Sequence, residues 1–128
     1  MSQHWELPED LSASAFARER VRTALTGLGM TGEALEEAEL IASELAANAV
    51  RYGQTPYTLT LEASADRVRI MVSNHGSTED PQLIDAEIYS HHGRGLAIVT
   101  ALAEGLGWDR QGDRLDVWAD LRVVPQAD

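Results

Sequence analysis

Two hairpin patterns constrain the fold of this 128-residue chain more than any other feature. In the first, residues 57–62 and 67–72 carry apolar side chains at every second position and are joined by the stretch EASADR. In the second, residues 108–110 and 115–121 flank QGDR, and apolar residues again alternate after the turn. A period of two on either side of a short polar turn is typical of β-hairpins. The sequence therefore predicts two antiparallel hairpins.

Helices are expected where apolar residues recur three or four positions apart. Ser12 or Ser14 is a suitable N-cap for the first helix, and Thr31 is a suitable N-cap for the second. Glycines follow each helical pattern and are expected to end it. The expected helices cover residues 12 or 14 to 28, 33 to 52, and 95 to 104.

The order of the predicted elements gives the fold class. A short strand in the first ten residues precedes two helices, a hairpin, a long loop over residues 74–92, a third helix and the second hairpin. Clustered hairpins favour a sheet whose apolar face is covered by helices. We therefore expect an α+β two-layer sandwich, with a mixed, mostly antiparallel sheet and helices packed on one face. The length favours a single domain over residues 1–128, with a loose tail at 122–128.

Composition argues against several kinds of partner and site. The formal net charge of −11 disfavours nucleic acid, because affinity for phosphate backbones comes from clustered basic residues. The absence of cysteine excludes disulfides and zinc sites built on cysteine. No apolar run approaches the roughly 20 residues that span a bilayer. The start, MSQHWELPED, lacks a signal-peptide pattern. We expect a cytoplasmic protein with no membrane partner.

The chain contains no lysine, and all ten of its basic residues are arginine. A Walker-type phosphate loop requires a lysine, and so does the third strand of a eukaryotic-type protein kinase. Both kinds of nucleotide site are therefore excluded. Any nucleotide chemistry in this chain has to use a site without lysine.

A polar stripe on the second helix is the first candidate site. At 100° per residue, Glu37, Glu44, Asn48 and Arg51 fall in a band about 60° wide, nearly opposite the alanine-rich apolar face. A solvated face is one interpretation. A pocket is the other, because the apolar Leu40 borders the same band. An amide oxygen suits Mg²⁺, a glutamate can deprotonate a hydroxyl or a water, and an arginine can contact phosphate.

Glycines mark two further candidate segments. VSNHGS places Asn74 and Gly76 just past a strand, and HHGRGLAIV places Gly93 and Gly95 at a helix start. Glycines at such positions leave backbone N–H groups open, and the N-terminus of a helix attracts anions such as phosphate. The alternative is an ordinary turn and an ordinary helix entry. The adjacent histidines before Gly93 cannot share a helix face, so a zinc site is not expected there.

The order of these motifs resembles that of the GHKL ATPases, which share the Bergerat ATP-binding fold. More closely, the chain resembles the small single-domain anti-sigma-factor serine/threonine kinases that are common in actinomycete-type genomes. AELIASELAANAVRYG is similar to the helix box of that family, and GRGLAIVTALAEGLGW with GDRLDVWADL is similar to its C-terminal pattern. The resemblance covers nearly the whole chain, from HWELPED to VWADL, and is weakest over residues 77–90.

The resemblance implies Mg-ATP as the ligand and a role for each matching residue. Glu44 would be the general base, Asn48 the Mg²⁺ ligand, and Arg51 would lie near the phosphates. Asn74 would meet the adenine amino group, and Gly76 would let adenine pack closely. The hinge of a lid over the phosphates would be formed by Gly93, Arg94, Gly95 and Leu96.

The resemblance also implies a function in transcription regulation. Members of the family phosphorylate a serine on an anti-sigma-factor antagonist, and often sequester a sigma factor as a dimer. The expected partners are therefore these proteins, and a homodimer is expected with them. One alternative is a catalytically weak or inactive Bergerat module that regulates transcription only by docking partners. The other is an acidic dimerisation domain in which the motif is accidental.

Two positions depart from the family pattern. Asn74 stands where the family usually has aspartate, so it meets adenine without charge assistance, at a cost on the order of 1 kcal/mol. Its amide nitrogen would instead suit a carbonyl such as that of guanine. Thr78 replaces the second glycine of the usual D-x-G-x-G motif. We therefore expect weakened or altered selection of the nucleobase.

Overall fold

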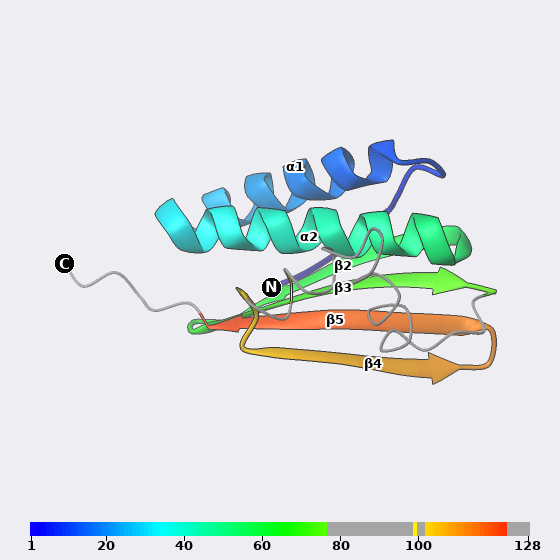
Figure 1. Ribbon diagram of the computed structural model, residues 1–128. Coiled ribbons are helices and arrows are strands. Elements are labelled where there is room, and N and C mark those ends of the chain that lie inside the picture. Colours follow the sequence, from blue (N-terminus) through cyan, green and yellow to red (C-terminus); the bar gives the residue numbers. More distant parts are fainter. Residues whose placement is uncertain (77–98, 100–101, 123–128) are drawn as a thin grey trace.

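The computed structural model describes residues 1–76, 99 and 102–122. Two helices and five strands lie in these residues, and Figure 1 shows their arrangement. In chain order they are β1 (Ser2–Glu6), α1 (Ser12–Gly27), α2 (Gly32–Tyr52), β2 (Gln54–Ala63), β3 (Arg67–His75), β4 (Gly105–Gln111) and β5 (Arg114–Arg122).

The five strands form one sheet in the order β1-β2-β3-β5-β4. Each neighbouring pair is antiparallel, and both predicted hairpins are present as β2–β3 and β4–β5. The second hairpin closes with Gln111 opposite Arg114, so only Gly112 and Asp113 form its turn. Gly112 has a φ of 60°, a conformation that glycine adopts without steric cost. The described part of the sheet is therefore antiparallel throughout.

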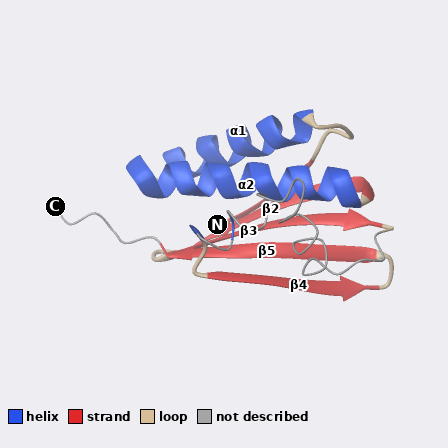
Figure 2. Cartoon of the chain, viewed as in Figure 1, coloured by secondary structure: helices blue, strands red, loops and turns tan. Residues whose placement is uncertain are grey.

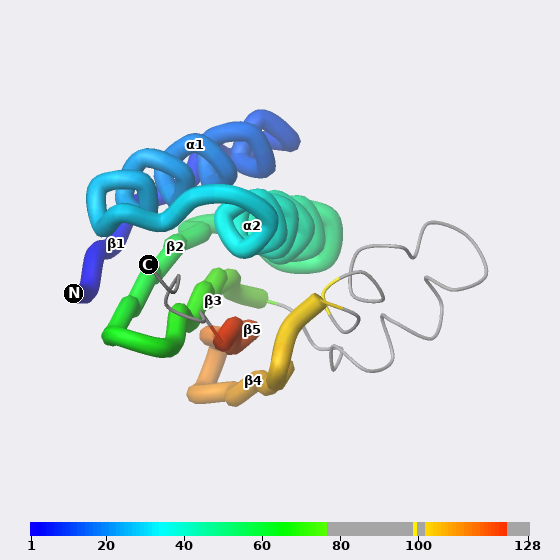
Figure 3. Tube along the Cα trace, turned by 90° about the vertical axis from the view of Figure 1, so that its left-hand side faces the viewer, coloured from blue at the N-terminus to red at the C-terminus, as the bar shows by residue number. Residues whose placement is uncertain are grey.

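The two helices pack side by side on one face of the sheet, as Figures 2 and 3 show. Helix α2 contacts β2, β3 and β5 as well as α1. Ser14 helps to join the helices, because its hydroxyl donates a 3.1 Å hydrogen bond to the carbonyl oxygen of Ser43. The predicted two-layer α+β fold is confirmed.

The core follows from the alternation in the strands and the small residues in the helices. Leu59, Leu61, Ile70 and Val72 point to the helical face and are buried. Buried alanines on α2 let the helix backbone approach the sheet and α1 closely. These alanines are Ala38, Ala42, Ala46 and Ala49.

The N-cap predicted for the first helix is wrong. The cap position is Leu11, and neither Ser12 nor Ser14 caps the helix with its side chain. Asp10 serves the first turn instead, because its carboxylate accepts hydrogen bonds from the backbone N–H and the hydroxyl of Ser12. These two hydrogen bonds hold the pKa of the Asp10 carboxyl below its usual value. Thr31 does occupy the N-cap position of α2, without a side-chain hydrogen bond.

Several predicted boundaries are corrected by pairing in the sheet. Strand β3 continues to His75, so the predicted loop does not begin at residue 74, and β4 begins at Gly105 rather than at residue 108. Arg122 pairs with Arg67 and is not part of a tail. Of the predicted third helix, Val99 and Leu102 are helical, while residues 95–98, 100 and 101 lie outside the described residues. The remainder of the tail, 123–128, also lies outside them.

A search of the described residues for membrane spans finds no helix with the length and apolar character that crossing a bilayer requires.

Candidate functional site

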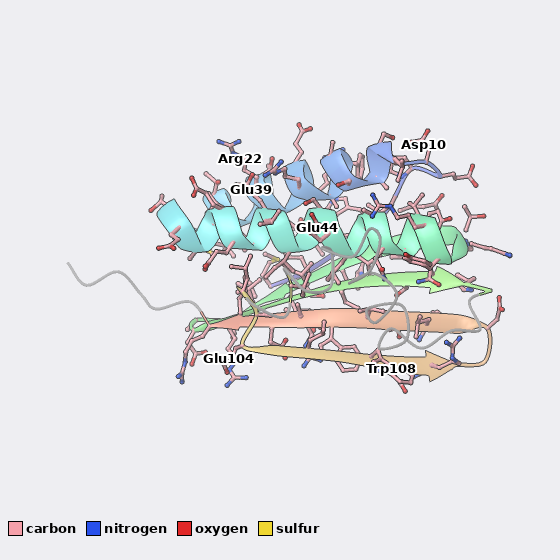
Figure 4. The ribbon with its side chains drawn as sticks, in the orientation of Figure 1. Asp10, Arg22, Glu39, Glu44, Glu104 and Trp108 are labelled. Carbon is pink, nitrogen blue, oxygen red and sulfur yellow. The ribbon has the colours of Figure 1, made fainter. Side chains whose placement is uncertain are left out.

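The polar stripe of α2 passes from solvent into the interior. Figure 4 shows Glu44 midway along the helix, where its side chain is partly exposed. Asn48, one turn later, is only 6% exposed. Arg51 is exposed in the last turn, where a positive charge also suits the helix dipole. The stripe is therefore not a uniformly solvated face, because Asn48 is buried between a partly exposed glutamate and an exposed arginine.

Two buried amide oxygens in this part of the molecule have no hydrogen-bond partner among the described residues. They are Oδ1 of Asn48 on α2 and Oδ1 of Asn74 at the end of β3, and Asn74 is only 3% exposed. A buried acceptor without a partner costs roughly 1–3 kcal/mol, and such atoms are rare in folded proteins. Each oxygen therefore has an unused capacity for a ligand donor, a cation or a water.

Asn74 lies against the end of α2. It pairs with Leu115 in the sheet and therefore points to the face that the helices cover. Its side chain touches Gly53, the residue that ends α2: a Cβ atom added to Gly53 would lie 2.2 Å from Asn74 Oδ1. The fold thus brings the end of α2, at Gly53, against Asn74 at the end of β3.

Gly76 follows β3 and is held by the turn of the β4–β5 hairpin. Its φ of 71° is in the left-handed region that favours glycine. Its backbone N–H donates to both the carbonyl oxygen and the Oδ1 atom of Asp113, each at 3.1 Å. The expectation of an open N–H group is therefore wrong at Gly76, because Asp113 already accepts that hydrogen bond. The space beside Gly76 is filled by Gln54, because a Cβ atom added to Gly76 would lie 2.8 Å from Cδ and from Oε1 of Gln54.

The predicted phosphate segment comprises residues 93–96, before the expected third helix. Gly93, Arg94, Gly95 and Leu96 lie outside the described residues, as do Thr78 and the two adjacent histidines. Their roles stay predictions from the sequence.

The described residues offer few ligands to a metal ion. They contain no cluster of three or more histidine, cysteine, aspartate or glutamate side chains that could hold one. Asn48 Oδ1 is a buried oxygen without a partner and fits a hard cation such as Mg²⁺. Because Mg²⁺ often binds through one or two protein oxygens together with waters and substrate phosphates, a single amide ligand is compatible with it.

A groove of about 820 Å³ lies elsewhere, between α1 and α2. It is lined by charged residues that include Arg22 and Glu39, and Figure 4 shows these two side chains on neighbouring helices. Arg18 spans part of it, with its Nε atom 3.7 Å from Glu39 Oε1. Neither Asn48 nor Asn74 lines this groove, so it is separate from the candidate nucleotide site.

Sequence reasoning missed three residues that shape the site. Gly53 was expected only to end α2, and Tyr57 only to begin a strand. The hydroxyl of Tyr57 donates a 3.1 Å hydrogen bond to the carbonyl oxygen of Gly53. Asp113 appears in the sequence as part of a hairpin turn, with no signal that it reaches Gly76. Contacts of this kind depend on tertiary packing and leave no periodic pattern in the sequence.

Solved structures with the same fold include proteins of three bacteria. The RsbU and RsbW domains of Rv1364c from Mycobacterium tuberculosis match with a TM-score of 0.73 and 19% identity, over 95% of this chain and 32% of that one. This chain thus spans about a third of that protein. The SiaB–SiaC complex from Pseudomonas aeruginosa matches with a TM-score of 0.64 and 12% identity, over 93% of this chain and 88% of that one. The Acinetobacter baumannii histidine kinase AdeS matches with a TM-score of 0.54 and 16% identity, over 94% of this chain and 68% of that one.

A comparison with curated protein sequences finds no significant match. The model of the histidine kinase-like ATPase domain matches residues 7–120, which include the whole of α1, α2, β2 and β3 and both candidate asparagines. The match extends over most of the chain, and the buried amides lie on the elements that it covers. The chain therefore belongs to the histidine kinase-like ATPase domain family.

Proposed function

We propose that this protein is a Mg-ATP-binding regulator that phosphorylates a serine on a protein partner. The observation that carries the proposal is the pair formed by Glu44 and Asn48, one turn apart on α2, in a histidine kinase-like ATPase domain. Glu44 is partly exposed and able to meet a substrate hydroxyl, whereas Asn48 is buried with an oxygen free to bind a cation. A base beside a cation ligand is the arrangement that phosphoryl transfer uses.

Each residue has one task in the proposed reaction. Glu44 accepts the proton of the serine hydroxyl while the serine oxygen forms a bond to the γ-phosphorus of ATP. The bond from that phosphorus to the bridging oxygen of the β-phosphate breaks, and ADP leaves. Arg51 supplies positive charge to the phosphates from the last turn of α2. Asn48 holds Mg²⁺, which neutralises phosphate charge when bound.

The partner is a protein in this proposal. One of the similar structures is a complex of two proteins, SiaB and SiaC, and another contains an RsbW domain. Together with the resemblance to anti-sigma-factor kinases, they support an anti-sigma-factor antagonist as the phosphate acceptor. Sequestration of a sigma factor and formation of a homodimer belong to the same proposal.

A second candidate function is a docking module that binds partners without transferring phosphate. Asn74 favours it, because a neutral amide stands where the related kinases usually place a carboxylate against adenine. The two candidates share the fold. The docking module holds a nucleotide or none, and it does not use Glu44.

The proposed site is tested by thermal unfolding with Mg-ATP and with Mg-GTP. A ligand at 100 times its dissociation constant raises the free energy of unfolding by about 2.7 kcal/mol, a readily visible shift. We expect a shift with Mg-ATP that decreases when EDTA removes the metal or when Asn48 is replaced by alanine. Absence of a shift with either nucleotide would contradict the kinase proposal and leave the docking module.

The Asn74→Asp substitution tests how this chain selects its base. The carboxylate restores charge assistance to the hydrogen bond from the adenine amino group. We expect Mg-ATP to bind more tightly by about 1 kcal/mol, roughly fivefold, with a higher ratio of ATP to GTP affinity. Isothermal titration with both nucleotides measures this. If neither the affinity nor the ratio changes, Asn74 does not contact the base.

A further inference from the structure

We propose that Gly53 and Tyr57 are positioning residues that fix the side chain of Asn74 and thereby set which nucleobase the site accepts. This inference rests on the proposed nucleotide-binding function. Gly53 ends α2 and Tyr57 lies in β2, so neither belongs to the strand that carries Asn74. The three residues nevertheless meet where the end of the helix reaches the end of β3.

The backbone of Gly53 does not by itself require glycine. Its φ of −123° and ψ of −176° are extended values that any residue adopts. The requirement comes from Asn74, because a Cβ atom on Gly53 would lie 2.2 Å from its Oδ1, 2.3 Å from its Cγ and 2.7 Å from its Cβ. Rotation of the amide can relieve the first two contacts. The third involves an atom fixed to the backbone of β3, so it cannot be relieved by a change of rotamer.

Gly53 is also held from both sides along its own backbone. Its N–H donates a 2.8 Å hydrogen bond to the carbonyl oxygen of Ala49, and its carbonyl oxygen accepts the 3.1 Å hydrogen bond from Tyr57. Tyr57 is only 5% exposed, and burial, together with the charge of Glu9, raises the pKa of its hydroxyl above the usual value. The hydroxyl therefore stays protonated and continues to donate at neutral pH. Gly53 cannot easily move away from Asn74.

Asn74 is the group on which this support acts. Asn74 is only 3% exposed, and its Oδ1 has no hydrogen-bond partner in the part of the chain that the structure describes. A buried amide usually takes its orientation from its hydrogen bonds. Here the contact with Gly53 restricts the position of the amide instead, leaving its hydrogen-bonding capacity for a ligand. An amino group on a purine edge matches the acceptor Oδ1, whereas a carbonyl oxygen does not.

Gly53→Ala is the direct test. We expect the dissociation constants for Mg-ATP and Mg-GTP to become nearly equal, and the better of the two nucleotides to bind about tenfold more weakly. Binding of Mg-tripolyphosphate, which has no base, should stay as in the unaltered protein. Gly27→Ala is the matched control, because no atom lies within 4 Å of a Cβ added at the end of α1. It should change neither affinity nor base preference.

Two further variants keep the test decisive if Gly53→Ala does not fold. Tyr57→Phe keeps the ring and removes only the hydrogen bond to Gly53, so we expect the ATP-to-GTP ratio to move towards one by about two- to fivefold. Asn74→Gly removes the side-chain atoms in contact with Gly53. In that background, Gly53→Ala should add no further loss, because the two residues act as one unit.

The outcomes distinguish failure of the positioning role from failure of the proposed nucleotide-binding function. Failure of the unaltered protein to bind either nucleotide overturns the proposed function, and the positioning role with it. Nucleotide binding by the unaltered protein, with an unchanged base ratio in folded Gly53→Ala, overturns the positioning role alone. An unchanged ratio of ATP to GTP affinity in Tyr57→Phe means that Tyr57 has no positioning role. If Gly53→Ala does not fold, the same unchanged ratio in Tyr57→Phe overturns the whole proposal.

Discussion

Replacement of Glu44 by alanine is expected to lower phosphoryl transfer by about 100- to 10,000-fold, the range that a general base contributes. Nucleotide binding should remain within about twofold, because Asn48, Arg51 and Asn74 are unchanged. Glu44 is partly exposed, so its loss leaves no buried charge unpaired. Release of labelled phosphate from the γ position of ATP measures the rate without a partner protein, since a base that activates a hydroxyl also activates water.

Glu37→Ala is the matched control for this substitution. Glu37 lies about two turns before Glu44 on α2 and is also partly exposed. Its removal should leave both the rate and the binding of nucleotide unchanged. If Glu44→Ala retains the full rate, or if both variants lose it equally, Glu44 is not the base. A folded protein that binds Mg-ATP and never releases phosphate, in any of its forms, would favour the docking module instead.

Replacement of Ile70 by alanine is expected to destabilise the fold by about 2–5 kcal/mol. Ile70 is fully buried on β3, which lies in the middle of the sheet and contacts α2. The substitution removes buried apolar surface and leaves a cavity beneath the helix that close-packed neighbours fill only in part. Chemical denaturation should show a lower free energy of unfolding without a change in the slope.

Met71→Ala is the control for Ile70, because the next residue of a strand points to the opposite face of the sheet. Met71 lies on the face without helices and is partly exposed, opposite Trp118. Its replacement should cost less than about 1.5 kcal/mol, since less apolar surface leaves the interior. Equal losses at the two positions would mean that the uncovered face of the sheet is as important to stability as the core.

The fold class was predictable because the strands and helices carry simple periods. In β3, Val68, Ile70 and Val72 alternate with polar or partly exposed residues, and this pattern has one natural reading. The boundaries were harder to place. Gly105 and Gly107 appeared to close a helix, but they belong to β4, where Gly107 leaves room for the ring of Trp118. A cross-strand contact of this kind is not visible in a local pattern.

The helical spacing of the candidate site residues was predictable, and their environment was less so. The spacing of Glu44 and Asn48 on one stripe follows from helix geometry alone. That Asn48 is buried and Glu44 only partly so depends on the neighbouring elements. The use of the Gly76 N–H by Asp113 depends on a turn 37 residues further along the chain. Open backbone groups were therefore predicted where the C-terminal hairpin already supplies an acceptor.

The position of β5 has a consequence for synthesis on the ribosome. It is the last described strand in chain order, yet it lies between β3 and β4 inside the sheet. Until it emerges, β3 presents an unpaired edge, which is a hazard for association with other chains. Asn74 cannot pair with Leu115 before β5 is present, and Gly76 cannot form its hydrogen bond to Asp113. A nascent or shortened chain lacking β5 would therefore lack both contacts of the proposed nucleobase site, so we expect nucleotide binding only after β5 has joined the sheet.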